Sequence, residues 1–257
     1  MITVKNASQI EKMQKAGELL HRVLEALRQE IAPGITTKEL DAKAERLIRD
    51  AGAIPSFKGY EGFPATICAS VDDEVVHGFP SDKPLEEGHI VSVDCGLILD
   101  GWQSDSAFTG MVGKCAPEIE ELVRVTEECF FLAAAQARAG NRLSDISHAV
   151  QEHAEKFGYG VIRAYTGHGI GREMHEDPSI PNYGPAGKGI RLREGMTLAI
   201  EPMIALKKWS VYIADNGWTA ITRDHSWCSH YEHTVAVTTG EPVILTLPGA
   251  KVQEDGR

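Results

Sequence analysis

The stretch that decides the fold runs from His89 to Asp105, HIVSVDCGLILDGWQSD. Two apolar, strand-like runs flank Asp100-Gly101, a dipeptide typical of the two-residue turn of a β-hairpin. With this turn, the numbers of facing residues add up to 201, so Asp105 lies opposite Gly96 and on the same face as Asp94. Such diagonal neighbours lie about 7–8 Å apart, within reach of a shared cation or cation pair. The hairpin alone leaves a second interpretation open, in which Asp94 merely ends its strand and Asp105 is exposed near the turn.

The sequence also repeats itself. Residues 85–94, LEEGHIVSVD, match residues 192–201, LREGMTLAIE, at an offset of 107 residues. Upstream, Gly52 at the end of a helical segment corresponds to Gly158, at an offset of 106 residues. Each half therefore contains two helices and then a strand that begins after Glu-Gly and ends on a carboxylate. This pattern predicts an α+β fold of two pseudo-symmetric halves, approximately residues 8–113 and 115–246, with antiparallel strands and one carboxylate from each half near a central axis.

Capping signals and helical periodicity predict four helices. Ser8 with Glu11 reads as a capping box at the start of the first helix, which Pro33-Gly34 ends. The other three are expected from Thr36-Thr37 to Gly52, over Pro117–Ala139 and over Ser144–Gly158. The spacing of His148 and His153 on the last helix fits no zinc-protease motif, so we interpret both as solvated helix residues.

The composition is that of a globular protein with a sizeable core, since 42% of the 257 residues are hydrophobic and 25% charged. The net charge of −11 repels DNA on average, although a local basic patch is compatible with RNA, so ribosome association stays open. No apolar run reaches the roughly 18 residues of a membrane span, and no secretory signal begins the sequence. Five cysteines without a CxxC pair argue against a disulfide framework. We therefore expect a cytoplasmic protein, and a monomer, because no heptad pattern predicts an oligomer.

Two more carboxylates and three histidines are candidates for chemistry. Glu201 follows the apolar run Leu-Ala-Ile, and Glu232 begins a strand-like run. Four carboxylates in such positions favour a metal cluster, because a lone buried charge costs several kcal/mol. His168 lies between glycines, which permit close backbone approach and leave the imidazole unobstructed. Taken singly, each of His77, His168 and His175 is more typical of a hydrogen-bonded loop histidine than of a functional one.

Ten short motifs together carry a family resemblance. In order, they are Tyr60-Glu-Gly-Phe-Pro64, Ile67-Cys68, Val76-His77-Gly78, Val93-Asp94, Ser104-Asp105, Thr166-Gly-His-Gly-Ile-Gly-Arg172, Met174-His175-Glu176, Ile200-Glu201-Pro-Met203, Asn216-Gly-Trp218 and Tyr231-Glu232-His-Thr234. The chain resembles the type I methionine aminopeptidases, which have the pita-bread fold, over nearly its whole length. The ordered set Asp, Asp, His, Glu, Glu is the most specific part of this resemblance.

The resemblance implies a single catalytic domain, residues 1–257, around a central site for two divalent metal ions. Its ligands would be Asp94, Asp105, His168, Glu201 and Glu232. A set with four carboxylates suits Mn²⁺, Fe²⁺ or Co²⁺, with Zn²⁺ as a further alternative. Two such ions lower the pKa of a shared water and stabilise a tetrahedral intermediate. In the family mechanism Glu201 is also a proton shuttle, His175 stabilises the scissile carbonyl oxygen, and His77 positions the substrate.

The implied substrate is the N-terminal methionine of nascent polypeptides and of peptides with a small second residue. The family's methionine pocket corresponds to Tyr60, Phe63, Cys68, Met174 and Trp218. From the residues alone, the glycine-rich loops around the aromatic members favour pocket walls over core. Cys68 has no basic neighbour, so we interpret it as a small core or pocket residue rather than a nucleophile.

The chain departs from the family pattern without losing any implied ligand. His230 stands where the family commonly has glutamine, and Asp72-Asp73 stand in a loop where it more often has asparagine. A proline-specific aminopeptidase or prolidase is the alternative within the same fold. A different class is an inactive relative that acts as a binding protein, which would be expected to have lost ligands. A calcium-binding protein is a third alternative, but His168 is a poor calcium ligand.

Overall fold

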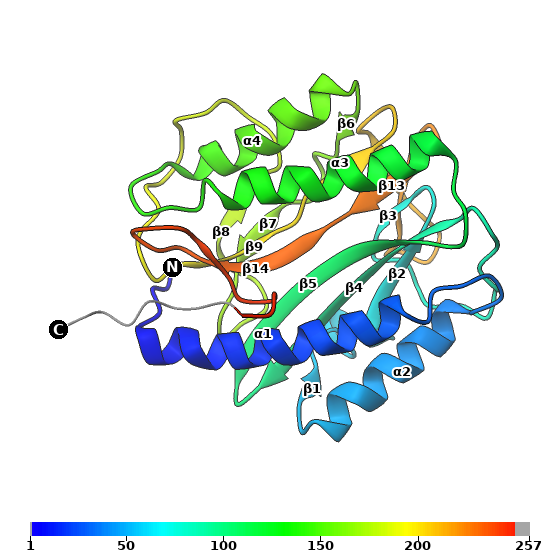
Figure 1. The fold of residues 1–257 in the computed structure, drawn as a ribbon, viewed down its shortest axis with the longest axis horizontal. Helices are drawn as coiled ribbons and strands as arrows, with labels where there is room; N and C mark the ends of the chain where they lie inside the picture. The colour runs from blue at the N-terminus through cyan, green and yellow to red at the C-terminus, as the bar shows by residue number, and fades with distance from the viewer. Residues whose placement is uncertain (1, 250–257) are drawn as a thin grey trace.

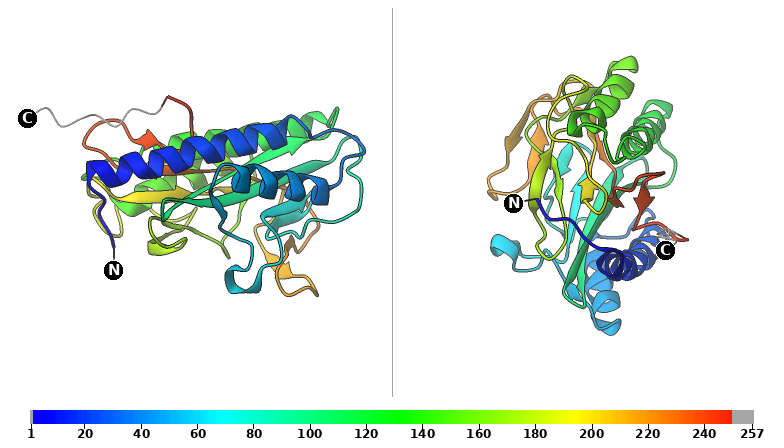
Figure 2. Two further views of the ribbon diagram at one scale, coloured as in Figure 1. Left: turned by 90° about the horizontal axis from the view of Figure 1, so that it is seen from below. Right: turned by 90° about the vertical axis from the view of Figure 1, so that its left-hand side faces the viewer.

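The computed structural model describes residues 2–249 and has two layers, with the helices against one face of a large sheet (Figures 1 and 2). Loop residues 55–64 and the hairpin of β11 and β12 project from the opposite face (Figure 2). No helix within residues 2–249 is both long and apolar enough to cross a membrane. The helices are α1 (Ala7–Arg28), α2 (Thr37–Asp50), α3 (Pro117–Ala134), α4 (Leu143–Lys156) and a short 3₁₀ helix (Tyr60–Gly62).

Nine strands of the described chain form the large sheet, and every pairing in it is antiparallel. Its spatial order is β1-β4-β5-β14-β9-β7-β8, with β2 also on β4 and β15 also on β14. The bounds are β1 (Ile54–Pro55), β2 (Ile67–Val71), β4 (Ile90–Leu99), β5 (Trp102–Met111), β7 (Gly167–Gly169), β8 (Glu176–Ile180), β9 (Thr197–Ile200), β14 (Glu232–Ala236) and β15 (Val243–Ile244).

Two small sheets flank the large one. The first has the order β13-β10-β6 and the second the order β11-β12-β3. Their strands are β3 (Glu74–Val76), β6 (Gly160–Val161), β10 (Met203–Ala205), β11 (Val211–Ile213), β12 (Ala220–Thr222) and β13 (Cys228–His230).

Each helix pair buries its own core against a different part of the sheets. The α1/α2 pair packs on β2, β4 and β5, through residues such as Leu20 and Val93. The α3/α4 pair packs on β9, β10 and β14, through residues such as Phe130 and Leu198. The α+β class and the antiparallel strands expected from the sequence are confirmed. The repeat boundaries near residues 113 and 115 and the single catalytic domain stay predictions.

The hairpin register is confirmed, but one expected strand end is wrong. Gly96 pairs with Asp105, as the Asp100-Gly101 turn predicts. Strand β4, however, continues to Leu99, so Asp94 lies within the strand instead of ending it. The β4–β5 ladder supplies hydrogen bonds on both sides of Asp94, and the strand therefore has no reason to stop there.

The helix ends also differ from the sequence expectations. The first cap is Asn6, whose side chain accepts a hydrogen bond from Gln9 N, while the Gln9 side chain accepts one from Asn6 N. The helix therefore starts before Ser8, and it ends at Arg28, well before Pro33. Helix α3 ends at Ala134 rather than Ala139. On α4, His148 and His153 are half-buried rather than solvated, and His153 pairs with Glu128 at 2.8 Å.

Candidate metal centre and adjoining cavity

Five neighbouring strands each bring one predicted ligand to the same face of the sheet. In spatial order they are β4 with Asp94, β5 with Asp105, β14 with Glu232, β9 with Glu201 directly after its end, and β7 with His168. Ala107 pairs with Asp94 on one side and Glu232 on the other, and Asp105 shares its face. The candidate ligands, far apart in the sequence, therefore converge because of the strand order.

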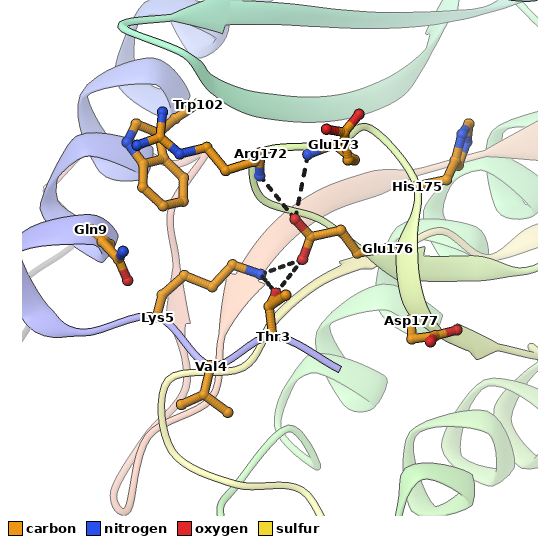
Figure 3. A pocket seen from close by; sticks show the side chains of 10 residues that line it. All are labelled: Thr3, Val4, Lys5, Gln9, Trp102, Arg172, Glu173, His175, Glu176 and Asp177. Atoms are coloured by element: carbon orange, nitrogen blue, oxygen red, sulfur yellow. Dashed lines mark hydrogen bonds and ion pairs between the residues drawn. The ribbon is translucent and has the colours of Figure 1, made fainter. Parts of the chain in front are cut away.

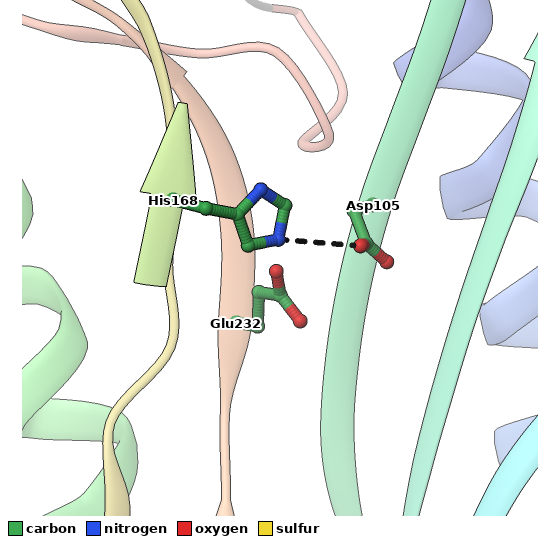
Figure 4. Close-up of side chains that lie close together, drawn as sticks. All are labelled: Asp105, His168 and Glu232. Atoms are coloured by element: carbon green, nitrogen blue, oxygen red, sulfur yellow. Dashed lines mark ion pairs between the residues drawn. The ribbon is translucent and has the colours of Figure 1, made fainter. Parts of the chain in front are cut away.

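The side chains of Asp105, His168 and Glu232 point toward one another from three strands (Figure 4). Each offers a ligand atom, and these atoms lie within 4.8 Å of one another. The Nε2 atom of His168 is 3.8 Å from Asp105 Oδ2 and 3.7 Å from Glu201 Oε1. Ligand atoms that each bind one ion at about 2.0–2.2 Å lie about 3–4 Å apart, so the spacing suits a divalent cation.

Three carboxylate oxygens in this cluster lack a hydrogen-bond partner. Asp94 Oδ1, Asp105 Oδ1 and Glu232 Oε1 are buried and accept no hydrogen bond within residues 2–249. Across residues 2–249, the ion-pair partners of Asp105, Glu201 and Glu232 are imidazoles. Burying carboxylates without compensation costs several kcal/mol each. The donor set therefore fits a bound cation.

Burial dominates the electrostatics of the metal-free cluster. It raises the pKa of Asp105 to about 7 and the pKa values of Asp94, Glu201 and Glu232 well above their ordinary range. Repulsion between the carboxylates adds to the pKa increase for Asp94, Glu201 and Glu232. Burial also lowers the pKa of His168 to about 4, so its imidazole is neutral at pH 7. Divalent ions would favour the ionised carboxylates and reverse the pKa increases.

The backbone around His168 explains the two glycines beside it. A Cβ atom on Gly167 would lie 2.4 Å from Ala199 O, and one on Gly169 would lie 2.1 Å from Asp177 O. The close backbone approach expected from the sequence is therefore confirmed. The Nδ1–H of His168 donates to Gly169 O at 2.9 Å in the tautomer that leaves the Nε2 lone pair facing the carboxylates.

A cavity of about 200 Å³ opens beside the cluster. Every predicted ligand and substrate-binding residue lines it: Tyr60, Phe63, Cys68, His77, Asp94, Asp105, His168, Met174, His175, Glu201, Trp218 and Glu232. Sequence reasoning missed Phe57, Glu61, Val76, Tyr165 and Thr166, which line it too. The aromatic, glycine-rich loop at 55–64 was a signal for Phe57, whereas Tyr165 and Thr166 simply precede the glycine-flanked histidine.

One wall of this cavity is apolar. Phe63 and Trp218 make an edge-to-face contact with ring centroids 5.3 Å apart, and Cys68 joins them in one buried cluster. Burial raises the pKa of the Cys68 thiol well above its ordinary value. A protonated, buried thiol is a small apolar wall, not a nucleophile.

Two further histidines face the same cavity. The rings of His175 and His168 have centroids 4.4 Å apart, and His175 Nδ1 is 2.9 Å from the exposed Tyr60 hydroxyl. His77 has the left-handed φ of 60°, a strained conformation for a residue with a side chain. Its ring contacts those of Tyr165 and Trp218 edge to face.

A second cavity adjoins the first across His175 and is lined partly by the N-terminal segment (Figure 3). Here the buried Lys5 ammonium lies 2.7 Å from Glu176 Oε2. The other oxygen of Glu176 accepts a hydrogen bond of 2.9 Å from Arg172 N. The segment before α1 thus holds the loop that carries His175.

Comparison with known proteins agrees with this arrangement. Residues 11–239 match metallopeptidase family M24. A methionine aminopeptidase of Clostridium acetobutylicum is 52% identical over 248 residues, which cover 96% of this chain and 99% of that protein. The structure of the Thermotoga maritima methionine aminopeptidase matches with a TM-score of 0.94 at 46% identity, covering 96% of this chain and 99% of that one. The structure of the Pyrococcus furiosus prolidase matches with a TM-score of 0.77 at 27% identity. The match covers 98% of this chain and 66% of the prolidase chain.

These matches confirm the pita-bread fold and the use of divalent metal that the resemblance implied. They extend over almost the whole chain, and they include the strands that carry all five candidate ligands. The chain therefore belongs to metallopeptidase family M24.

Proposed function

We propose that the protein removes the N-terminal methionine from nascent polypeptides and from peptides whose second residue is small. The observation that carries this proposal is a buried carboxylate–imidazole cluster that opens onto a small cavity with one apolar wall. The relatives at 52% and 46% identity that are named methionine aminopeptidases support the same substrate.

We propose that Asp94, Asp105, His168, Glu201 and Glu232 hold two divalent ions, with Mn²⁺, Fe²⁺ or Co²⁺ favoured over Zn²⁺. When bound, such ions would supply Lewis acidity and would lower the pKa of water toward the neutral range. The donor set of four carboxylates and one imidazole is the observation that favours these metals.

The remaining steps belong to side chains of this chain. Glu201, at the cavity wall, would accept a proton from the attacking water and transfer it to the departing amine. His175 would donate its Nε2–H to the scissile carbonyl oxygen, because the Tyr60 hydroxyl at Nδ1 favours that tautomer. His77 would orient the substrate, and the strain in its backbone shows that the surrounding fold holds it in one place.

The apolar wall explains the proposed choice of side chain. Phe63, Cys68, Met174 and Trp218, together with Tyr60 at the mouth, would enclose an unbranched thioether. Met174 and Cys68 are buried, so the pocket has little freedom to enlarge. Larger or branched first residues would clash with this wall.

The deciding experiment compares hydrolysis of Met-Ala-Ser and Ala-Pro-Ala by chelator-treated protein to which Mn²⁺, Fe²⁺ or Co²⁺ is restored. We expect metal-dependent release of methionine and no cleavage before proline. Cleavage of the proline peptide alone would contradict the pocket assignment and favour the prolidase alternative. Metal binding without any cleavage would favour an inactive relative that acts as a binding protein.

The proposed function has a cellular location and an oligomeric state that can be tested. Nascent chains emerge in the cytoplasm, and we propose that the protein acts there as a monomer. Light scattering during size-exclusion chromatography tests the monomer. Association with ribosomes would bring the enzyme to its substrate, and co-sedimentation with ribosomes at low salt tests it.

A further inference from the structure

A buried histidine faces two carboxylates of the candidate metal cluster. His230, the last residue of β13, is 1% exposed. Its Nε2 atom is buried and makes no hydrogen bond within residues 2–249. The same atom lies 3.7 Å from Glu232 Oε2 and 4.0 Å from Glu201 Oε2. A buried polar nitrogen left without a partner costs about 1–3 kcal/mol, so its direction toward two carboxylates calls for an explanation.

The carboxylate of Glu201 lies between two imidazoles. Its Oε1 atom is 3.7 Å from His168 Nε2, and its Oε2 atom is 4.0 Å from His230 Nε2. One oxygen therefore faces the side of the cluster where His168 offers its lone pair. The other oxygen faces His230, which does not line the cavity.

The backbone holds His230 in a fixed position relative to both glutamates. Its N–H donates to Thr109 Oγ1 at 3.0 Å, and that hydroxyl donates to the carbonyl oxygen of His230 at 2.9 Å. His230 also pairs with Met203, two residues after Glu201, while Glu232 follows two residues after His230. The imidazole is thus carried on the paired strands that connect to the two glutamates.

We propose that His230 is a positioning residue of the metal centre. When cations are bound, its Nε2–H donates to the Glu201 and Glu232 oxygens that face it, and this fixes the orientation in which their other oxygens bind the cations. Hydrogen bonds of this kind from outside the ligand set orient ligating carboxylates and raise metal affinity. The present distances from His230 Nε2 to the two glutamate oxygens exceed the usual length of a hydrogen bond by less than about 1 Å. The inference rests on the metal centre proposed above.

A matched set of variants separates the N–H donor of His230 from its imidazole ring. Glutamine also carries an N–H donor, so His230→Gln keeps the donor and removes the imidazole. His230→Leu removes the donor and keeps an apolar side chain in the buried space. His153→Leu is the control, because His153 is half-buried against Glu128 and lies outside the cavity lining.

The test is calorimetric titration of Mn²⁺ into the chelator-treated full chain. We expect His230→Leu to weaken Mn²⁺ binding by about 10–100-fold, the usual effect of losing such a partner. The Mn²⁺ affinity of His230→Gln should stay within about threefold of the parent value, because the glutamine amide supplies an N–H donor without an imidazole. The visible spectrum of the Co²⁺-loaded protein should keep its band positions in His230→Gln, because the ligand set is unchanged.

Three outcomes would overturn the proposal. Equal Mn²⁺ affinity in the parent and His230→Leu would show that the donor has no role. An equal loss in His230→Gln and His230→Leu, with shifted Co²⁺ bands, would make the imidazole a direct ligand. A parent that binds no Mn²⁺, Fe²⁺ or Co²⁺ would refute the metal centre itself. If His230→Leu does not fold, as judged by circular dichroism of the metal-free protein, His230→Met replaces it in the same comparison.

Discussion

Glu201 is the residue that we propose to act both as a metal ligand and as a proton carrier. It directly follows β9 and precedes Pro202, which restricts its backbone to extended conformations. Its side chain is 13% exposed, at the wall of the cavity. The backbone that carries the carboxylate is therefore restricted, and the side chain is open to a substrate on its cavity side.

Glu201→Gln should abolish most turnover while the fold stays intact. The amide keeps the size of the side chain but cannot take up a proton, and general acid–base catalysis contributes about 10²–10⁴-fold to a rate. The measurement is kcat for Met-Ala-Ser, with circular dichroism as the control for folding. Activity close to that of the parent would remove Glu201 from the proposed mechanism.

The stability of the metal-free protein should fall as the pH rises from 6.5 to 8. Burial raises the pKa of Asp105 to about 7, so from about pH 4 to 7 the folded state retains a proton that the unfolded state releases. Because the folded state binds more protons than the unfolded state, the free energy of unfolding falls as the pH rises. The lowered pKa of His168, about 4, acts in the opposite direction, but only between about pH 4 and its ordinary value of 6.5. The lowered pKa values of His230 and His233, about 3, act in the same direction as that of His168, and above pH 6.5 the raised pKa values of the cluster carboxyls outweigh these histidine contributions.

Thermal unfolding of the chelator-treated protein at several pH values between 6.5 and 8 tests this expectation. Asp105→Asn is the matched control, because the amide does not titrate and should flatten the trend. A metal-free protein that gains stability up to pH 8 would contradict the burial of protonated carboxyl groups.

At the scale of elements, the N-terminal segment and the loop before β8 depend on each other. Lys5 and Glu176 have side chains only 4% and 8% exposed, and Thr3 also donates to Glu176 (Figure 3). Lys5 N donates to Gly195 O at 2.7 Å, which fixes the segment beside β9. A Cβ atom on Gly171 would lie 2.5 Å from both Lys5 Cε and Glu176 Oε1, so this glycine makes room for the ion pair.

Lys5→Met should destabilise the protein by about 3–5 kcal/mol, because it leaves the Glu176 carboxylate buried without its cation. Lys5→Met combined with Glu176→Gln should recover part of this loss. Lys38→Met is the control, since Lys38 pairs with Asp82 on the surface and should change stability by less than about 1 kcal/mol. Urea unfolding provides the free energies. Equal effects of Lys5→Met and Lys38→Met would contradict the structural role of the buried pair.

At the scale of the whole molecule, the candidate metal centre lies between two separately packed regions. Asp94 and Asp105 belong to strands under α1 and α2, whereas Glu232 and Glu201 belong to strands under α3 and α4. Cations bound by both sets would bridge the two cores. Metal removal should therefore affect the stability of the entire fold and not only the cavity.

For each Mn²⁺ site, free Mn²⁺ at about 100 times the Kd of that site should stabilise the protein by about 2.7 kcal/mol, because the ion binds the folded state alone. For a chain of this size that corresponds to a rise in Tm of about 5–10 °C. Calorimetric scans with Mn²⁺ and with chelator measure this difference. His168→Ala should reduce the rise, and an identical Tm with and without Mn²⁺ in the parent would contradict the bridging role.

The sequence by itself determined the features that depend on neighbouring residues. Turn chemistry at Asp100-Gly101 set the register of one hairpin, and that register put Asp94 and Asp105 on one face. The family resemblance supplied the remaining candidate ligands and the cavity residues. The first helix cap could not be decided locally, because Asn6 with Gln9 and Ser8 with Glu11 both form the capping pattern.

Only the tertiary structure decided which distant segments meet. The order β4-β5-β14-β9-β7 brings five ligands together, and no local pattern encodes pairing between strands so far apart in the sequence. The direction of His230 toward Glu201 and Glu232, and the burial of Lys5 against Glu176, arise in the same way. Local sequence sets turns, caps and faces through short-range sterics and hydrogen bonds, whereas the geometry of this site depends on long-range strand pairing and packing.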